Sequence, residues 1–424
     1  MSAERLRFCM PTTFYPPYHF GGDAIAVQRL ARALVRAGHE VAVVHDVDAY
    51  RALGGKGPSV EEAGSDDQGV SVIRLESRLP RLSTLLTQQT GSPVVHGRQL
   101  RTILQPGRFD VVNFHNVSLV GGPAIMHMAA DATRIYMAHA HWTVCPTHVL
   151  YRYHKELCTG KQCFRCQLSY RRPPQLWRYT GTMRRALNGV DTFIAMSQFS
   201  RDKHREFGFP FDMEVLPAFL PEQDPERPAT TTSPHPRPYF LFTGRLERIK
   251  GVDHLIAAST EYEDADILIA GSGHHEEALR QQAAGNPRIH FLGHVPVDAL
   301  RPYYENALAV VVPSICFETF GLGLIEAFRS GVPVIARRLG PFPELIAASS
   351  GGLLFSTNTE LREAMRSIHS TPGLRERLSG AAREAFLEHW TERTVLPAYL
   401  DIVQRAGARA TVRRGGPRAR PVSA

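Results

Sequence analysis

A repeated alternation of short apolar segments with amphipathic helical segments constrains the fold of this chain most strongly. Near the start, apolar runs at residues 6–10 and 40–44 flank a segment in which Ala26, Leu30 and Leu34 lie at helical spacing. Short apolar runs predict buried strands, and the intervening spacing predicts a helix with one apolar face. A strand, a helix and a second strand in so short a span indicate an open parallel sheet.

The alternation continues and then starts again after a proline-rich segment at residues 221–238, which is typical of a linker. Ligands of open parallel sheets bind beyond the carboxyl ends of the strands, so two facing sheets would place their loops across one cleft. Further strands are predicted at 110–114, 134–138 and 192–196 before the linker, and at 239–243, 267–270, 289–292 and 310–312 after it.

The predicted fold class is therefore α/β, with two Rossmann-like, doubly wound parallel-sheet domains. Arginines among Gly, Pro and Ala at the end of the chain cannot build a core, so we expect that part to be disordered. The predicted divisions are an N-terminal domain at 1–220 with a cysteine-rich insert near 145–166, the linker at 221–238, a C-terminal domain at 239–384, a helix at 385–404 packing back on the N-terminal domain, and a tail at 405–424.

Length and composition agree with two soluble domains. The chain has 424 residues, of which 43% are hydrophobic and 21% charged, so it can bury substantial cores. No apolar run approaches the roughly 20 residues that span a bilayer, and there is no signal-peptide pattern. We expect a cytoplasmic protein, free or at the cytoplasmic face of a membrane. The net charge of +8 indicates only non-specific attraction to anions, and without a recognised module we expect no nucleic-acid partner.

Two cations and flexible backbone follow the first strand of the C-terminal half. Gly244 and Arg245 come directly after that strand, and Lys250 and Gly251 lie just before a predicted helix. A guanidinium binds phosphate oxygens as a planar fork and an ammonium binds them as a point charge. The pair could therefore neutralise a diphosphate leaving group without a metal. Two solvated surface cations are the alternative.

Two glutamates stand on either side of a helix start predicted near Gly321. Glu318 lies on the loop after a buried strand, whereas Glu326 would lie roughly 7–8 Å along the helix at 1.5 Å per residue. Because a helix start binds anions, phosphates could lie there with Glu326 at a ribose and Glu318 at a sugar. A helix cap and a paired structural carboxylate are the alternative, but the apolar neighbours of Glu326 disfavour a merely solvated side chain.

Together these segments resemble the retaining glycosyltransferases of family four, the glycosyl transferases group 1, which have the GT-B fold. The resemblance spans almost the whole chain. It rests on the Gly21-Gly22 loop, the stretch 244–251, the loop Gly271-Ser272-Gly273, and Glu318 with Glu326 in an E-x7-E pattern.

The resemblance implies that the domain at 1–220 lies on the acceptor side and that the domain at 239–384 binds the nucleotide sugar. It also implies a donor site and a reaction. Arg245 and Lys250 would hold the donor diphosphate, while Glu318 would contact the donor sugar without acting as a covalent nucleophile. Glu326 would bind ribose hydroxyls, and Gly22 would approach the phosphate from the opposite domain. Transfer would retain the anomeric configuration and need no cofactor, and the acceptor would be a glycan, a lipid-linked saccharide or another glycoconjugate. The other residues predicted to bind the donor are Gly21, Gly244, Gly271, Gly273, Phe320 and Gly321.

A histidine at a strand end is the remaining catalytic candidate. The family has a histidine near the donor sugar in a run similar to His-Asp-Tyr-Trp-Leu-Leu-Cys-Pro, and residues 139–146 here are His-Ala-His-Trp-Thr-Val-Cys-Pro. Alignment on the last two residues selects His139, with His141 in place of an aromatic residue. Ala140 replaces the usual acid, and Pro341 follows Gly340 where the family often has two glycines. A structural histidine is the alternative.

Four cysteines follow that run: Cys145, Cys158, Cys163 and Cys166, in the pattern C-x12-C-x4-C-x2-C. Without an export signal, such a group favours a metal or redox role over a disulfide framework. The last spacing suits tetrahedral zinc and the others fit no standard finger, so a structural zinc and unrelated reduced thiols are both open. A metal here would shape acceptor binding rather than perform catalysis.

Residues 170–185 interleave arginines with Tyr170, Trp177 and Tyr179. Such a segment could dock an anionic membrane or a lipid-diphosphate acceptor, and a solvated basic face is an equal alternative.

Four other functions compete with the transferase. A nicotinamide oxidoreductase is disfavoured, because Glu276 stands where the dinucleotide fingerprint needs glycine. A metal-dependent transferase of the other main fold would use an Asp-x-Asp pair, and residues 46–48 offer one, whereas residues 264–266 precede their strand. That fold does not easily accommodate a second sheet. A sugar-nucleotide epimerase on the same scaffold and a non-catalytic nucleotide-sugar-binding protein stay open.

Overall fold

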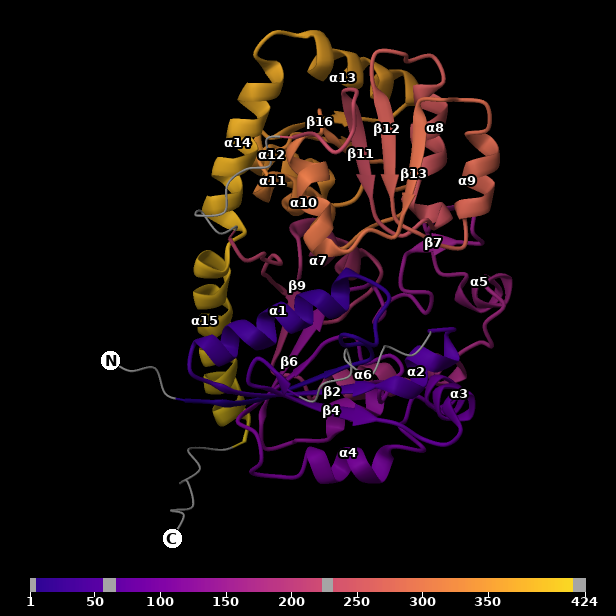
Figure 1. Cartoon of the computed structure of the whole chain (residues 1–424). Helices are drawn as coiled ribbons and strands as arrows, with labels where there is room; N and C mark the ends of the chain where they lie inside the picture. Colours follow the sequence, from indigo (N-terminus) through magenta and orange to yellow (C-terminus); the bar gives the residue numbers. More distant parts are fainter. Residues whose placement is uncertain (1–4, 56–65, 223–231, 415–424) are drawn as a thin grey trace. The chain divides into compact units, whose positions relative to one another are not determined.

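The computed structural model describes residues 5–55, 66–222 and 232–414, and the chain divides into two units. Within the described residues, the N-terminal unit holds the chain up to Ser197, Arg201–Leu216 and the chain from Val395 on. The C-terminal unit holds Gln198–Ser200 and Pro217–Thr394. Each unit has its own largely parallel sheet with helices around it (Figure 1). The predicted pair of α/β domains is therefore confirmed.

The N-terminal sheet is parallel apart from one short edge strand, β3, which runs antiparallel to β4. The chain order reverses between β1 and β5, so the loops that follow these two strands diverge at the carboxyl edge. In sheet order the strands are β10 (Glu214–Val215), β9 (Thr192–Ala195), β6 (Thr133–Ala138), β5 (Val111–Phe114), β1 (Arg7–Thr12), β2 (Glu40–Asp46), β4 (Val70–Leu75) and β3 (Asp66–Asp67).

Helices and a hairpin complete the N-terminal unit. Helix α1 buries Ala24, Val27 and Leu30 because its apolar residues recur at helical spacing. The other elements are α2 (Val47–Ala52), α3 (Pro80–Thr90), α4 (Gly97–Ile103), the 3₁₀ turns η2 (Pro123–His127) and η3 (Leu176–Tyr179), the hairpin β7 (Tyr151–Arg152) and β8 (Glu156–Leu157), α5 (Cys163–Ser169), α6 (Thr182–Leu187) and α7 (Gln198–Glu206), with α1 at Gly22–Arg36.

The C-terminal sheet is parallel throughout its described pairs, and its chain order reverses between β11 and β14. Its strands, in sheet order, are β13 (Ile289–Gly293), β12 (Asp266–Ala270), β11 (Tyr239–Thr243), β14 (Val310–Val312), β15 (Val334–Arg337) and β16 (Gly352–Phe355).

Helices pack on both faces of this sheet. Helix α8 contacts α9 and α13, whereas α14 contacts α11 and α12. In Figure 1, α8 and α9 lie on one side of β12 and β13, and α10, α11 and α12 on the other. The ranges are η4 (Arg248–Lys250), α8 (Val252–Ser259), α9 (Glu276–Gln282), α10 (Val297–Glu305), α11 (Leu322–Arg329), α12 (Phe342–Ser349), α13 (Asn358–Ser370) and α14 (Leu374–His389).

The predicted disorder from residue 405 is wrong for the part of the tail that the structure describes. Helix α15 (Glu392–Arg413) continues through it and buries Ala406 and Ala410. Arg405 and Arg409 both pair with Glu214 of β10. The small residues on one face of α15 and the ion pairs with Glu214 stabilise this end of the helix, although its composition predicted disorder. Residues 415–424, and residues 223–231 of the predicted linker, lie outside the described residues.

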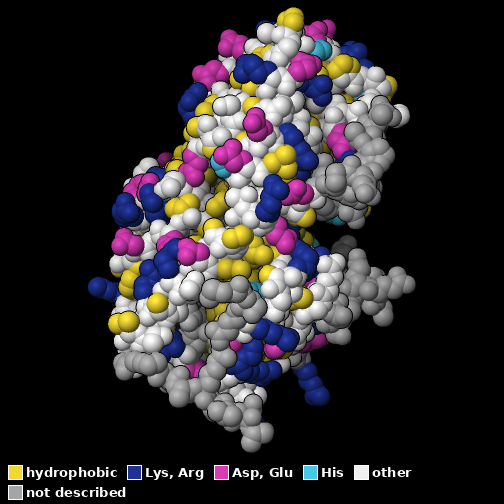
Figure 2. Space-filling view, turned by 90° about the vertical axis from the view of Figure 1, so that its left-hand side faces the viewer, with side chains coloured by type: hydrophobic (Ala, Val, Ile, Leu, Met, Phe, Trp, Pro, Cys, Tyr) yellow, Lys and Arg dark blue, Asp and Glu magenta, His cyan; other side chains and the backbone are white. Residues whose placement is uncertain are grey.

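The surface charge and the helix lengths can be compared with the expected absence of a nucleic-acid partner and of a membrane-spanning segment. Basic and acidic side chains are interspersed on the face that Figure 2 presents. Among the described residues, no helix combines the length and the apolarity that crossing a bilayer requires.

Candidate functional site

Three loops meet at the carboxyl edge of the C-terminal sheet. Backbone N–H groups join them: Gly244 donates to Ala270 at 3.0 Å and Leu246 to Ser272 at 2.9 Å. Ile315 donates to Ile249 at 2.9 Å and so ties the loop after β14 to the loop after β11. Because the chain order reverses between β11 and β14, this is the edge where an open α/β sheet binds its ligand.

Glycines permit the close approach of these loops. Gly271 has φ 147°, and a Cβ there would lie 1.8 Å from the carbonyl oxygen of Gly244. A Cβ on Gly273 would lie 2.4 Å from the carbonyl oxygen of Leu246. A side chain at either position would push the loops apart. Both glycines predicted to bind the donor thus have a clear role in shaping this edge, and contact with a donor stays a prediction.

Lys250 and Glu318, predicted from separate motifs, form an ion pair with 2.8 Å between Nζ and Oε1. The same Oε1 accepts a hydrogen bond from Ser314 Oγ at 2.7 Å. Burial alone would lower the pKa of Lys250, but the charge of Glu318 outweighs it and raises that pKa. Burial would likewise raise the pKa of Glu318, but Lys250 and the Ser314 hydroxyl lower it. Both side chains are thus held in their charged forms.

Arg245 lies beside this pair and is exposed. Its positive charge acts on both Lys250 and Glu318. One carboxylate therefore faces two cations, which leaves local positive charge for an anionic ligand.

Glu326 lies in α11, which begins at Leu322 after Gly321, close to the predicted helix start. Its Oε2 accepts a hydrogen bond from the hydroxyl of Tyr304 at 3.2 Å, and that hydroxyl also bonds with Thr243 Oγ1 at 2.7 Å. Burial raises the pKa of Tyr304, so the phenol stays protonated. A buried phenol thus holds the Glu326 carboxylate in place.

The loop before α11 contains the other predicted donor residues. Phe320 is buried, and Gly321 has φ 147° in a position crowded by Phe342 and Leu345. Gly340 has φ 64°, and a Cβ there would lie 3.5 Å from the backbone nitrogen of Glu318. The departure at Pro341 is accommodated, because this proline directly precedes the first residue of α12.

His139 follows β6 at the carboxyl edge of the N-terminal sheet. Its Nε2 lies 2.8 Å from Nδ1 of His115, which follows β5. Burial lowers the pKa of both rings, and the charge of Asp23 opposes the shift at His139. The two histidines are therefore a neutral, hydrogen-bonded pair near pH 7. His141, by contrast, is fully buried with its ring 5.1 Å from that of His204.

The predicted glycines of the N-terminal unit stand at the start of α1. Gly22 is the first residue of that helix, and Gly21 precedes it in an extended conformation. Asp23 lies in the first turn and accepts a hydrogen bond from Asn116 at 3.3 Å. A phosphate role for these glycines stays a prediction.

The residues selected from the sequence did not include Thr243, Tyr304, His115 or Ser314. No local pattern marks Tyr304, because its partner Glu326 lies on a different helix. Ser314 carried a usable signal, since it follows a buried strand four residues before Glu318.

Both aspartates of the Asp46–Asp48 pair have protein partners. Asp46 accepts a hydrogen bond from the Ala49 backbone at 3.0 Å, and Asp48 from Ser77 at 2.9 Å. Asp48 also lies 2.9 Å from Nε2 of His96. Both carboxylates are buried. Their bonds cap α2 and join neighbouring segments, which makes them structural residues.

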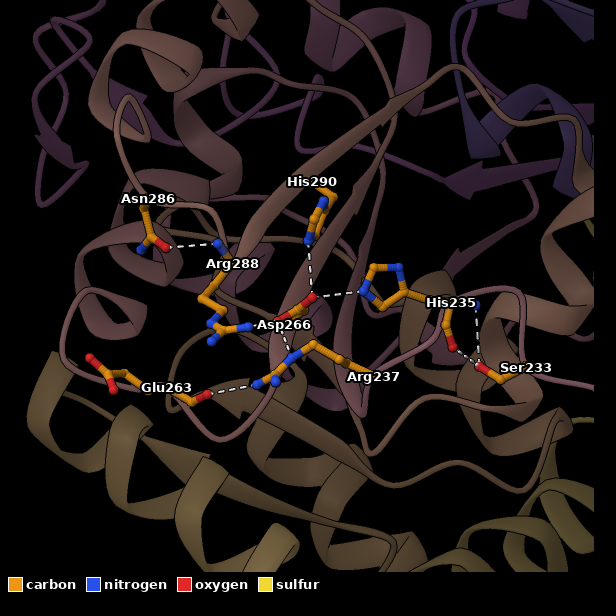
Figure 3. A network of polar contacts seen from close by, with 8 residues as sticks. All are labelled: Ser233, His235, Arg237, Glu263, Asp266, Asn286, Arg288 and His290. Atoms are coloured by element: carbon orange, nitrogen blue, oxygen red, sulfur yellow. Dashed lines mark hydrogen bonds and ion pairs between the residues drawn. The ribbon is translucent and has the colours of Figure 1, made fainter.

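Asp266 begins β12 and so lies at the amino edge of the C-terminal sheet. Its Oδ2 is 2.7 Å from His235 Nε2 and 3.0 Å from His290 Nε2. Its Oδ1 is 3.0 Å from Arg237 and 3.6 Å from Arg288 (Figure 3). Although two histidines and a carboxylate are a metal-binding set, the two guanidinium groups already neutralise this carboxylate.

Comparison with known proteins decides the family. The model of glycosyltransferase family 4 matches residues 20–224, and that of the glycosyl transferases group 1 matches residues 223–385. This chain belongs to the group 1 glycosyltransferases. It is accordingly an enzyme that uses a nucleotide-sugar donor.

Individual relatives and solved structures agree with this family. Glycogen synthase of Mycobacterium tuberculosis is 26% identical over 421 residues, covering 93% of each chain. Sucrose-phosphate synthase from Thermosynechococcus elongatus has a TM-score of 0.73 at 20% identity, over 95% of this chain and 100% of that one. Anabaena HepE in complex with UDP-glucose has a TM-score of 0.63 at 16% identity, over 95% and 100%. The structural likeness shows that this glycosyltransferase has the GT-B fold.

Proposed function

We propose that this glycosyltransferase moves a hexose from a nucleoside-diphosphate sugar to a hydroxyl of a glycan, a lipid-linked saccharide or another glycoconjugate in polysaccharide biosynthesis, with retention at the anomeric carbon. The observation that carries the proposal is the Lys250–Glu318 ion pair with Arg245 beside it. As the sugar–phosphate bond breaks, negative charge develops on the diphosphate. Two preorganised cations stabilise that charge, so no metal ion is required for departure.

The carboxylates take separate roles in this proposal. Glu318 positions the donor sugar and holds Lys250 in its charged form, whereas Glu326 accepts hydrogen bonds from ribose hydroxyls. Glu326 is suited to that role because its carboxylate accepts hydrogen bonds and the buried Tyr304 phenol holds it in place. His139 contributes a neutral imidazole that hydrogen-bonds the donor sugar.

A UDP-hexose is the donor that we propose to test first. HepE, which shares the fold, was crystallised with UDP-glucose, and a glycogen synthase is among the relatives. The experiment is turnover with a panel of UDP-, GDP- and ADP-sugars and saccharide acceptors, followed by NMR of the product anomer. Transfer with retention is the expected result. Transfer with inversion would overturn the mechanism. An altered free sugar would instead support an epimerase, and binding without turnover a non-catalytic nucleotide-sugar-binding protein.

We also propose that the N-terminal unit docks on an anionic membrane. Its surface exposes Leu79, Leu82 and Leu85 around α3, and Leu176 and Tyr179 on η3. The two elements are joined, because Trp177 Nε1 donates to the Gln88 carbonyl at 2.9 Å. Leu79 and Leu176 are 62% and 63% exposed, and a contiguous group of exposed apolar side chains marks an interaction site.

Arginines accompany this apolar surface. Arg78 and Arg81 flank Leu79 in sequence, and Arg171 and Arg172 precede η3; all four are exposed. Apolar side chains entering the headgroup region, with cations beside them, match an anionic lipid surface. At that surface the enzyme would meet a lipid-linked acceptor.

Sedimentation with vesicles tests this docking. The chain should bind phosphatidylglycerol-containing vesicles and not neutral ones, and Leu82→Ser with Leu176→Ser should reduce binding about tenfold or more. Val412→Ser, at an exposed residue of α15, is the matched control and should bind like the wild type. Failure of the wild-type chain to bind anionic vesicles would refute the proposal.

A further inference from the structure

All four cysteines of the C-x12-C-x4-C-x2-C pattern line one pocket in the N-terminal unit. Each is a free thiol; Cys145 and Cys166 are buried, while Cys158 and Cys163 are half-buried. The other two cysteines of the chain lie elsewhere, Cys9 in β1 and Cys316 on the loop after β14. Of the six cysteines, the four of this pattern therefore come from separate chain segments to line one pocket.

The local fold brings the four thiols to one pocket, although their spacing in the sequence matches no standard zinc finger. Cys163 and Cys166 are three residues apart on α5, so they share a helix face. The β7–β8 hairpin returns the chain so that Cys158 lies near Cys163 and Cys166. The Cys158 backbone N–H donates to the Leu150 carbonyl at 2.8 Å. Cys145 enters from the turn after His141, whose carbonyl accepts the Cys145 N–H at 2.7 Å.

The hairpin is fastened to α5 by its own contacts. The ring of His154 stacks on that of Tyr170, with 3.7 Å between centroids. The hydroxyl of Tyr170 donates to the carbonyl of Tyr151. Positive φ angles recur in this short loop, at His148, Leu150, Tyr153 and His154. Non-glycine residues adopt this conformation at a cost and keep it only where the surroundings hold them.

The pocket lining selects the kind of ligand. Apart from the four cysteines it contains Arg152 and neutral residues, and it has no carboxylate or imidazole. A set of sulfur donors suits zinc rather than calcium or magnesium, which prefer oxygen. A zinc ion with four thiolates has net negative charge, and Arg152 would offset part of it.

We propose that Cys145, Cys158, Cys163 and Cys166 bind one structural zinc ion that fastens the β7–β8 hairpin to α5. Binding releases the four thiol protons to solvent and involves no change of oxidation state. Among the described residues, two His/Asp sets are the only groups of three or more possible ligands whose atoms all lie within 4.8 Å of one another, so no three of these sulfurs are mutually that close. Side-chain rotation toward the pocket centre closes the site when the ion binds.

Metal analysis of the whole chain tests the proposal. Purified under reducing conditions after growth with zinc, the wild type should carry about one zinc ion per chain by mass spectrometry. Exchange for Co²⁺ should give the thiolate-to-cobalt absorption and tetrahedral bands of a sulfur site. Absence of zinc from the wild type, or a Co²⁺ spectrum without thiolate bands, would overturn the assignment.

Two variants locate the ion. Cys163→Ser changes a half-buried thiol and should abolish zinc binding, whereas Cys9→Ala removes a buried thiol outside the pocket and should leave the zinc content unchanged. Equal zinc content in Cys163→Ser and wild type would refute the site. If Cys163→Ser does not fold, the wild-type zinc content and Co²⁺ spectrum still decide. Disulfide bonds among the four cysteines in the wild type, detected by peptide mapping, would refute it as well.

Discussion

Two charged clusters lie at opposite edges of the C-terminal sheet, and they differ in how completely the protein satisfies them. At the amino edge, Asp266 is 4% exposed and has four partners, two histidines and two arginines. At the carboxyl edge, Glu318 and Lys250 are 20% and 25% exposed, and the charge of Arg245 adds to that of Lys250.

The contrast separates a structural cluster from a functional one. A buried carboxylate surrounded by cations and imidazoles makes its hydrogen bonds and ion pairs within the protein, so it joins segments and stabilises the fold. The carboxyl-edge cluster is more exposed and lies where the sheet order reverses, so its cations can contact an anionic ligand. We therefore expect changes at Asp266 to alter stability and changes around Lys250 to alter turnover.

The largest expected effect is on the rate of transfer. Lys250→Ala should lower kcat roughly 10²–10³-fold, because it removes a preorganised cation from the leaving group. The matched control is Arg237→Ala, which removes a cation from Asp266 at the other edge and should leave kcat unchanged. Steady-state kinetics on the folded variants measures both kcat values. Equal losses of kcat in the two variants would contradict the distinction between a functional and a structural cluster.

The second effect is on stability. Asp266→Asn should lower the free energy of unfolding by about 1–3 kcal/mol, because two partly exposed arginines lose the charge of their buried partner. Urea denaturation measures the change, and kcat of the folded variant should stay near that of the wild type. A large fall in kcat with unchanged stability would assign Asp266 to the reaction instead.

A smaller effect is expected on donor affinity. Glu326→Ala should raise KM for the nucleotide sugar about tenfold, with less change in kcat, because ribose hydrogen bonds exist in ground and transition states alike. Glu363→Ala, at an exposed position of α13, is the control. A fall in kcat at constant KM would move Glu326 from the binding of ribose to the chemical step.

The smallest effect concerns pH. Burial alone would raise the pKa of Asp266, but bonds from His235, His290 and Arg237 lower it. A lowered folded-state pKa means that the stabilisation is complete above the unfolded value and is lost as pH falls through the folded one. The stability difference between wild type and Asp266→Asn should therefore shrink below about pH 4 in urea titrations. A difference that grows on acidification would contradict this sign.

Much of the fold followed from local pattern. The strands predicted at 239–243 and 310–312 coincide with β11 and β14, and the helix predicted from Val252 is α8. Strands β4, β15 and β16 were not predicted, since runs of four to six residues carry too little periodicity to separate strand from helix. The predicted tail failed for a different reason: its helix depends on Glu214 and Asp191, which lie far away in sequence.

The site was predicted in parts and assembled only by the fold. The sequence by itself determined the two α/β units, the glycine-rich loops at strand ends and the residue types Arg, Lys and Glu, because strand and helix periods and turn chemistry are local properties. Tertiary structure decided that Lys250 pairs with Glu318, that Tyr304 holds Glu326 and that His115 holds His139. Such pairs depend on which strand ends lie side by side, and strand order is set by packing over the whole sheet.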